Sequence, residues 1–256
     1  MAIWLMTIIL LVSGVVAGLL SSVAGLASLV SYPVLLMLGV PPISANTTNT
    51  AALIFTGIGS SASSLKELRS SKKTLWRVAV YVLLGSIVGS FLLVIAPATT
   101  FTRVVPFLVF GAGILMLWSQ FHHPAVTRSA TVQTKRSTSI LKNLTVFLVG
   151  IYIGYFGASA GMILLSILIV TLNESFAVTN AIKNFTCFLA NTLSLVIYAF
   201  TTKIYWWMVV PLGIGMFIGG YLGPMVIRHV PARPLRVVIA FAAFILAAYL
   251  FYTAYF

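Results

Sequence analysis

The same spacing of three glycines occurs twice in this sequence, each time inside a long apolar segment. The two sets lie 136 residues apart and are Gly14, Gly18 and Gly25, and Gly150, Gly154 and Gly161. Glycines four residues apart let helix backbones approach closely, and clustered glycines allow a helix to break. The pattern therefore predicts two related halves, each beginning with an interrupted helix.

Further residues repeat at similar distances, which extends the duplication over the whole chain. The pairs are Asn46 and Asn180, Trp76 and Trp206, Gly85 and Gly215, Gly89 and Gly219, and Arg103 and Arg236. Duplicated apolar halves with an interrupted first segment are typical of secondary transporters whose substrate site lies near the middle of the membrane. We therefore divide the chain into a first transmembrane repeat (1–120), a cytoplasmic connector (121–141) and a second transmembrane repeat (142–256).

The composition excludes an ordinary soluble domain. Hydrophobic residues make up 61% of the chain and charged residues only 7%, whereas about a quarter of the residues in a soluble domain are charged. Apolar segments long enough for membrane helices occur at about 3–38, 45–64, 75–96, 103–120, 142–172, 176–200, 205–227 and 235–254. The expected fold is an all-α, multi-pass protein of the cell (plasma or inner) membrane, with about four helical segments per repeat.

The first and fifth apolar segments are too long for one untilted helix. In the fifth, helices at 144–157 and 160–172 would each be about 20 Å long, which is short of a hydrocarbon core of about 30 Å. Two arrangements fit: one discontinuous span, or a re-entrant hairpin that enters the membrane and returns. Irregular backbone at that depth is tolerated only where it is buried in protein or lines a cavity.

The distribution of Lys and Arg predicts how the halves are oriented. In the first half the basic connector is 65–77, and in the second it is 228–236 rather than 201–204. Basic connectors face the cytoplasm, so equivalent connectors would lie on opposite sides of the membrane. This favours two inverted-topology repeats in which the first and fifth segments make no net crossing; if each crossed once, the halves would be parallel.

The net charge of +13 does not indicate nucleic-acid binding, because the cations lie almost wholly between apolar segments. There they orient the helices and contact anionic lipid. As partners we expect a small anionic substrate and a bilayer with anionic lipid, no nucleic acid, and we leave a homodimer open. The N-terminus lacks the basic region of a cleaved signal peptide, so we expect it to be retained.

Enzymatic and metal chemistry lack the residues that they need. The stretch 157–161, GASAG, matches the G-x-S-x-G pattern of hydrolases, but its flanks are apolar helix rather than a strand and a helix. The acidic residues are Glu67 and Glu174 alone, and the histidines are His122, His123 and His229. We therefore expect no enzyme, no metal site, no cofactor and no proton coupling through a buried carboxylate.

Two polar clusters stand at matching positions directly after the interrupted segments. They contain Asn46, Asn49 and Thr50 in SANTTNT, and Asn180, Lys183 and Asn184 in VTNAIKN. One interpretation is that these side chains are ordinary N-caps of the following helices. The other is that the free N–H groups and the positive dipole end of each helix start bind an anion.

Lys183 lies about two turns into an otherwise apolar helix. It either extends to the membrane surface or provides the counter-charge for an anionic substrate. Asn191, two further turns along the same face, is placed to hydrogen-bond substrate or another helix. Together with the two polar clusters, the candidate substrate site includes Gly25, Ser159 and Gly161 from the interruptions, where small residues permit close backbone approach.

At these residues the chain resembles the TauE/SafE family of sulfite and organosulfonate exporters. The resemblance rests on Gly25, Pro33, Gly39-Val40-Pro41, Ala45 and Thr48-Asn49 in the first half, and on Ala181-x-Lys183, Asn191 and the stretch IYWWMVVPLGIGMFIGGYLGPMVIRHVPARPLR in the second. It covers nearly the whole chain. The family's run of consecutive glycines is replaced here by SSVAG at 21–25 and GASAG at 157–161, changes that bear on substrate and affinity.

The resemblance implies a four-plus-four membrane permease that moves a small sulfur-containing anion, such as sulfite or an organosulfonate. We expect an exporter that works by alternating access at a midplane site. Two alternatives remain: a channel for an anion or a neutral solute, and a non-transporting membrane assembly factor.

Overall fold

The computed structural model describes residues 3–121, 136–172 and 174–226, and in the last segment 241, 244–245, 247–252 and 254–255. All regular elements within these residues are helices. They are α1 (Ile3–Ala24), α2 (Ser28–Met37), α3 (Pro42–Ser63), α4 (Leu65–Ser70), α5 (Lys72–Ile95), α6 (Ala98–Phe121), α7 (Arg136–Tyr155), α8 (Ala160–Thr171), α9 (Phe176–Thr201) and α10 (Trp206–Val226).

Long apolar helices dominate the described part, as the composition predicts. Helices α1, α5 and α9, and residues Trp206–Met225 of α10, are long and apolar enough to cross a membrane, while α2 and α8 are shorter apolar helices. The basic connector 65–77 is largely helical, because it contains α4 and the start of α5. The basic connector 228–236, most of 121–141 and much of the last apolar segment lie outside the described residues.

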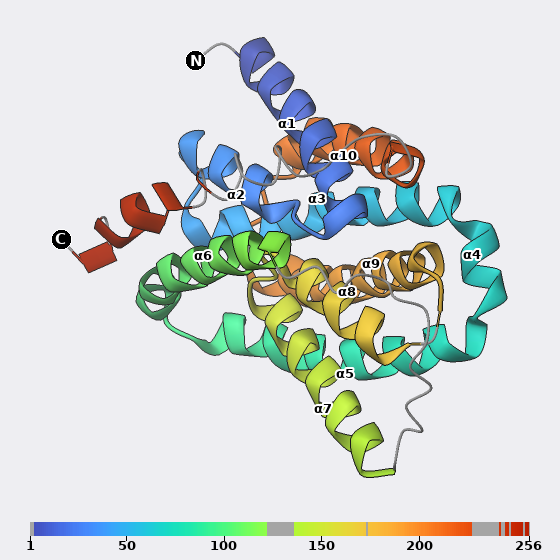
Figure 1. Ribbon diagram of the computed structural model, residues 1–256. Coiled ribbons are helices and arrows are strands. Elements are labelled where there is room, and N and C mark those ends of the chain that lie inside the picture. Colours follow the sequence, from blue (N-terminus) through green and yellow to red (C-terminus); the bar gives the residue numbers. More distant parts are fainter. Residues whose placement is uncertain are drawn as a thin grey trace.

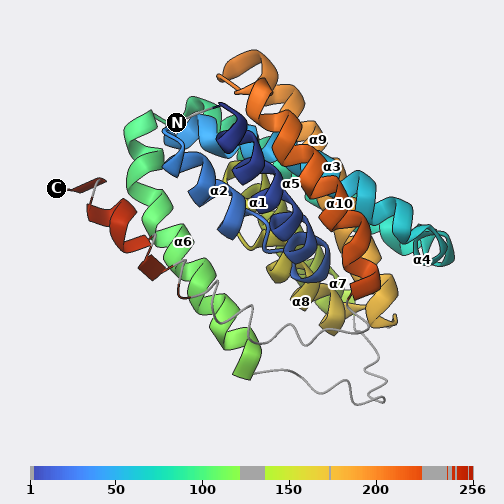
Figure 2. The ribbon, with the colours of Figure 1, turned by 90° about the horizontal axis from the view of Figure 1, so that it is seen from above.

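Both long segments are interrupted where the small residues cluster. Helix α1 ends before Gly25, whose φ is +74°, and α7 ends before Gly157, whose φ is +73°. Glycine adopts such angles at little cost because it has no Cβ. After the break α2 runs back beside α1 (Figures 1 and 2), and α8 runs back beside α7 (Figure 1). Each interrupted segment is therefore a helical hairpin rather than one straight discontinuous helix.

The fixed spacing of 136 residues does not hold through the breaks. It pairs Gly25 with Gly161, but the left-handed glycine that matches Gly25 is Gly157. Gly25 follows Gly18 by 7 residues, whereas Gly157 follows Gly154 by only 3. Helix α1 therefore continues for about one more turn before its chain reverses.

The first helix of each half packs against the third long helix of the other half. Helix α1 contacts α10 along its length, and α7 contacts α5 in the same way. A Cβ added at Gly14 or Gly18 would overlap the carbonyl oxygen of Leu212 or Met216, and one added at Gly154 would overlap that of Ser86. The repeated glycines are thus the points at which paired helices touch backbone to backbone.

Helices α3 and α9 lie between these two pairs. Helix α3 packs against α10 and α9, and α9 packs against α5. In Figure 1, α1, α3 and α10 form an upper layer and α5, α7 and α9 a lower one, and the colours show that α3 and α9 run in opposite directions. The two interrupted segments reach the centre of the molecule from opposite layers.

Candidate functional site

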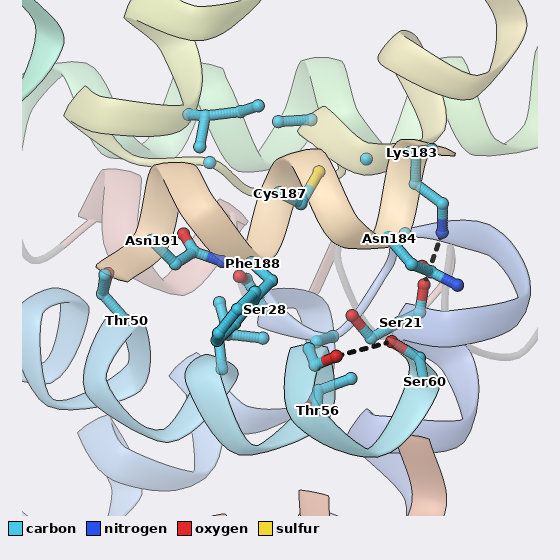
Figure 3. A pocket seen from close by; sticks show the side chains of 18 of the residues that line it. Ser21, Ser28, Thr50, Thr56, Ser60, Lys183, Asn184, Cys187, Phe188 and Asn191 are labelled. Atoms are coloured by element: carbon cyan, nitrogen blue, oxygen red, sulfur yellow. Dashed lines mark hydrogen bonds between the residues drawn. The ribbon is translucent and has the colours of Figure 1, made fainter. Parts of the chain in front are cut away.

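A cavity of about 50 Å³ lies where both interrupted segments meet α3 and α9 (Figure 3). One water needs about 10–15 Å³, so the cavity suits a small molecule or ion of a few heavy atoms. The lining comes from both halves and consists of Ser21, Gly25, Ala27, Ser28, Thr50, Leu53, Thr56, Gly57, Ser60, Ile153, Phe156, Gly157, Ala160, Gly161, Lys183, Asn184, Cys187, Phe188 and Asn191.

Helices α3 and α9 present equivalent faces to this cavity. The equivalent lining pairs, each 134 residues apart, are Thr50 and Asn184, Leu53 and Cys187, and Gly57 and Asn191. Steps of three and four residues keep these side chains on one face of each helix. The duplication seen in the sequence is therefore also a duplication of the cavity wall.

The polar clusters of α3 and α9 do not lie at helix N-termini. Helix α3 begins at Pro42, and α9 begins after Ser175, whose Oγ accepts a hydrogen bond from the Val178 amide. Asn46 and Asn180 consequently lie about one turn inside their helices. The prediction that these clusters are N-caps or expose free helix N–H groups is wrong, because proline and serine start both helices earlier. What the clusters contribute is side-chain donors.

Helix N-termini do border the cavity, but they belong to α2 and α8. Ala27 and Ser28 lie at the start of α2, and Ala160 and Gly161 lie at the start of α8. The positive ends of two helix dipoles therefore face the same small space. This arrangement is typical of anion sites in carriers with discontinuous helices.

Lys183 does not reach the surface of the protein, because its side chain is only 1% exposed. Its Nζ donates to the carbonyl oxygens of Ser21 at 2.9 Å and Ser22 at 3.4 Å, in the last turn of α1. The Ser22 carbonyl also accepts hydrogen bonds from the Nδ2 atoms of Asn180 at 2.9 Å and Asn184 at 3.1 Å. The last carbonyls of a helix lack partners within it, so α9 caps α1 across the two halves.

The charge of Lys183 has no carboxylate beside it. The chain contains two acidic residues; neither Glu67 nor Glu174 lines the cavity, and Glu174 accepts a hydrogen bond from Ser71 at 2.5 Å. An ammonium group has three N–H donors, and two of them serve α1. The third remains for the cavity, which Lys183 borders (Figure 3).

In the first half, neutral groups occupy the corresponding positions. Asn46 donates to the carbonyl oxygen of Tyr155, the last residue of α7, at 3.1 Å, just as Asn180 caps α1. Asn49, which matches Lys183 at the same 134-residue spacing, stays within its own half. Its Nδ2 donates to Ser28 Oγ at 3.0 Å, and its Oδ1 accepts from Ser31 Oγ at 2.5 Å.

The two breaks touch at their glycines. A Cβ added at Gly25 would overlap the backbone of Gly161, and one added at Gly161 would lie 2.7 Å from the Cα of Gly25. Ser159, also at the second break, has φ +60° and a buried hydroxyl without a hydrogen-bond partner, but it does not line the cavity.

Six of the predicted site residues line the cavity: Gly25, Thr50, Gly161, Lys183, Asn184 and Asn191. Asn46, Asn49 and Asn180 lie behind its wall and hold the breaks through hydrogen bonds. Sequence reasoning missed Thr56, which is 3% exposed, lines the cavity and has an unpartnered Oγ1. Its position seven residues after Asn49, on the polar side of α3, was the one available indication.

Among the described residues, no three His, Cys, Asp or Glu side chains come together in a way that would hold a metal ion. The cavity therefore offers an ammonium, amides, hydroxyls and helix N-termini. All of these groups attract an anion, and they provide no general base beside a nucleophile.

Comparison with known proteins agrees with this architecture. Residues 10–250 match the family described as sulfite exporter TauE/SafE. A probable membrane transporter protein of Haemophilus influenzae is 27% identical over 249 residues, which cover 95% of this chain and 94% of the relative. The probable membrane transporter protein ORF9 of a Sinorhizobium species is 23% identical over 233 residues, covering 90% of this chain and 85% of the relative.

No solved structure matches the chain significantly. The family match covers most of the sequence, including every residue that lines the cavity. The chain is a multi-pass membrane transporter rather than an enzyme. It belongs to the TauE/SafE sulfite exporter family.

Proposed function

We propose that this transporter exports a small sulfur-containing anion, such as sulfite or an organosulfonate, from a site in the cavity between α3 and α9. The observation that carries the proposal is the buried ammonium of Lys183, which borders the cavity without a carboxylate to neutralise it. An unpaired charge is costly to bury. A bound anion beside Lys183 would lower that cost and would use its third N–H donor.

Neutral donors on the other walls suit the oxygens of a sulfite or sulfonate group. Thr50, Thr56, Asn184 and Asn191 line the cavity together with the N-termini of α2 and α8. Apolar groups of Leu53, Ile153, Phe156 and Phe188 complete the lining and leave room for a short carbon substituent. A site of this kind binds one anionic head and tolerates a small apolar tail.

We infer that the two halves are inverted repeats that move against each other. Reciprocal packing of α1 with α10 and of α7 with α5 supports a twofold relation, because such symmetry makes the same contact twice. The opposite directions of α3 and α9 in Figure 1 support an axis in the plane of the membrane. Rocking of one repeat against the other would then open the cavity to each side in turn.

The direction of transport follows from the membrane potential of the cell membrane, in which we place this carrier with anionic lipid at its basic cytoplasmic connectors. With the inside negative, a monoanion that leaves the cell gains about 2.3 kcal/mol per 100 mV. Outward movement therefore needs no second ion to drive it.

Thermal unfolding of the purified protein tests the proposal. Sulfite, sulfoacetate and taurine should be compared with sulfate, thiosulfate and chloride at constant ionic strength. A ligand that binds only the folded state raises its stability in proportion to ln(1 + [L]/Kd), so we expect a saturable shift with sulfite or a sulfonate. If none of these anions shifts the unfolding temperature, the assembly-factor alternative is favoured.

The variant Lys183→Gln shows whether Lys183 provides the charge. A hydrogen bond to a charged group contributes about 1.5–3 kcal/mol, so the affinity for the anion should fall roughly ten- to a hundredfold. Lys142→Gln is the matched control, because Lys142 also donates to a helix-end carbonyl, that of Thr171, at 2.8 Å. Unchanged binding by Lys183→Gln would place the charge outside the site, and flux that does not saturate would indicate a channel.

A further inference from the structure

We propose that the carboxyl end of α1 is a monovalent-cation site in which the ammonium of Lys183 is the resident cation. The carrier would then hold its coupling cation covalently and work without an inorganic one. This goes beyond the proposed function, because it concerns the cation side of the transport cycle and not the anion.

The acceptors at this end of α1 are those that bind a cation. The backbone carbonyls at the carboxyl end of a broken helix carry the negative end of its dipole, and in carriers with discontinuous helices such carbonyls coordinate the coupling ion. Here the carbonyls of Ser21 and Ser22 accept hydrogen bonds from Lys183 Nζ instead. The neighbouring Asn180 adds a buried Oδ1 that has no hydrogen-bond partner.

No other charge is available to the same place. The sequences of α1, α2, α3, α8 and α9 contain a single charged side chain, that of Lys183. The group that neutralises the end of α1 is therefore supplied by the facing helix of the other half. It is tethered to α9 and remains there in every state that keeps α1 and α9 in contact.

The matching break in the second half is built differently. The last turn of α7 is capped by neutral donors: Asn46 Nδ2 at the Tyr155 carbonyl, and Ser90 Oγ and the Tyr198 hydroxyl at the Gly154 carbonyl. Neutral donors are sufficient to satisfy carbonyl groups at a helix end. The presence of an ammonium at only one of the two breaks therefore indicates a cation site and not a general need of capping.

Removing the tethered cation should create a site for a free one. In Lys183→Ala the Ser21 carbonyl loses its side-chain partner, and the space of the removed side chain lies beside it. We expect the unfolding temperature to drop by roughly 5–10 °C. Sodium or methylammonium, exchanged for N-methylglucamine at constant chloride, should restore much of that loss in a saturable manner, while the wild type shows no cation-specific shift.

Lys142→Ala is the control for this experiment. It removes the same kind of bond, from Lys142 Nζ to the Thr171 carbonyl, at a partly exposed position where water can replace the ammonium. Its unfolding temperature should therefore not respond to the choice of cation.

Two results would overturn the proposal. One is a Lys183→Ala protein that is destabilised yet unresponsive to sodium and methylammonium. The other is a sodium-specific stabilisation of the wild type, which can be measured even if the variant does not fold. Neither measurement includes a sulfur-containing anion, so failure of the anion proposal would leave this test intact.

Discussion

The two central helices place different residues at one pair of matched positions. Helix α9 has Lys183, which reaches across to α1, whereas α3 has Asn49, which bonds to two serines of its own hairpin. Around this pair the two halves are alike in their lining positions and in their capping asparagines. Duplication therefore supplies the frame, and a single divergent position gives the cavity its charge.

One lysine rather than two is the arrangement that a small cavity allows. Two ammonium groups facing a cavity of about 50 Å³ would repel each other strongly in a poorly solvated interior. A single cation suits a monoanion, and it also makes the two halves unequal partners in the transport cycle. Four predictions test how far this comparison of the halves extends.

The largest effect is expected from giving the first half its own lysine. Asn49→Lys would bury a second charge in place of an amide that is bonded to Ser28 and Ser31. An uncompensated buried charge costs about 3–5 kcal/mol, a large share of the stability of most domains. We expect little or no folded protein by size-exclusion chromatography, and partial recovery in the double variant Asn49→Lys/Lys183→Asn, which only exchanges the two residues.

Recovery in the exchange variant would mean that the halves accept the charge interchangeably. If Asn49→Lys alone yields normal amounts of folded protein, the asymmetry between the halves is not needed for folding.

The two left-handed glycines should respond unequally to alanine. Both have positive φ angles, which cost an L-residue about 1–2 kcal/mol. A Cβ at Gly25 would also overlap the backbone of Gly161, whereas one at Gly157 would lie 3.1 Å from its nearest neighbour, the Ile153 carbonyl oxygen. Gly25→Ala should therefore lower the unfolding temperature about twice as much as Gly157→Ala, and equal losses would show that the contact between the breaks yields easily.

The capping asparagines should differ in the opposite sense. Asn46 is the side chain that caps the Tyr155 carbonyl, while Asn180 shares the Ser22 carbonyl with Asn184 and Lys183. Leaving a buried carbonyl without a partner costs about 1–3 kcal/mol. Asn46→Ala should lose about that much stability, and Asn180→Ala less than about 1 kcal/mol. Chemical denaturation in detergent would measure both, and a larger loss at Asn180 would contradict the redundant capping of α1.

The smallest structural change tests the orientation of the halves. Single cysteines at Ser70 and Thr201, both exposed at the ends of helices, can be introduced in a Cys187→Ser background. With inverted repeats, an impermeant thiol reagent added outside cells should label Thr201→Cys and leave Ser70→Cys unreacted. The reverse labelling, or labelling of both, would contradict the inferred orientation.

Sequence patterns predicted the features that depend on residue size and polarity. The repeated glycines indicated both the breaks and the close helix contacts, because only small residues permit backbones to touch there. The absence of nearby acidic residues marked Lys183 as unusual, and the structure places it beside the cavity. These features follow from local chemistry and from its repetition along the chain.

Other features depend on contacts that no local pattern contains. The partners of Lys183 are backbone carbonyls of Ser21 and Ser22, and every residue has a carbonyl, so their role leaves no mark on the sequence. The same holds for the left-handed conformation of Gly157, which stands among several small residues. Pro42 and Ser175 moved the helix starts upstream of the polar clusters, since either residue begins a helix readily.

The exchange of helices between the halves has a consequence for how this protein is made. Helix α7 meets its partner α5 soon after leaving the ribosome, because α5 precedes it by about 40 residues. Helix α1 instead waits for α10, about 180 residues later, which at about 5–20 residues per second is roughly 10–40 s. During that interval the glycine-lined face of α1 lies against lipid or the insertion machinery, and the first half stays open until the chain is almost complete.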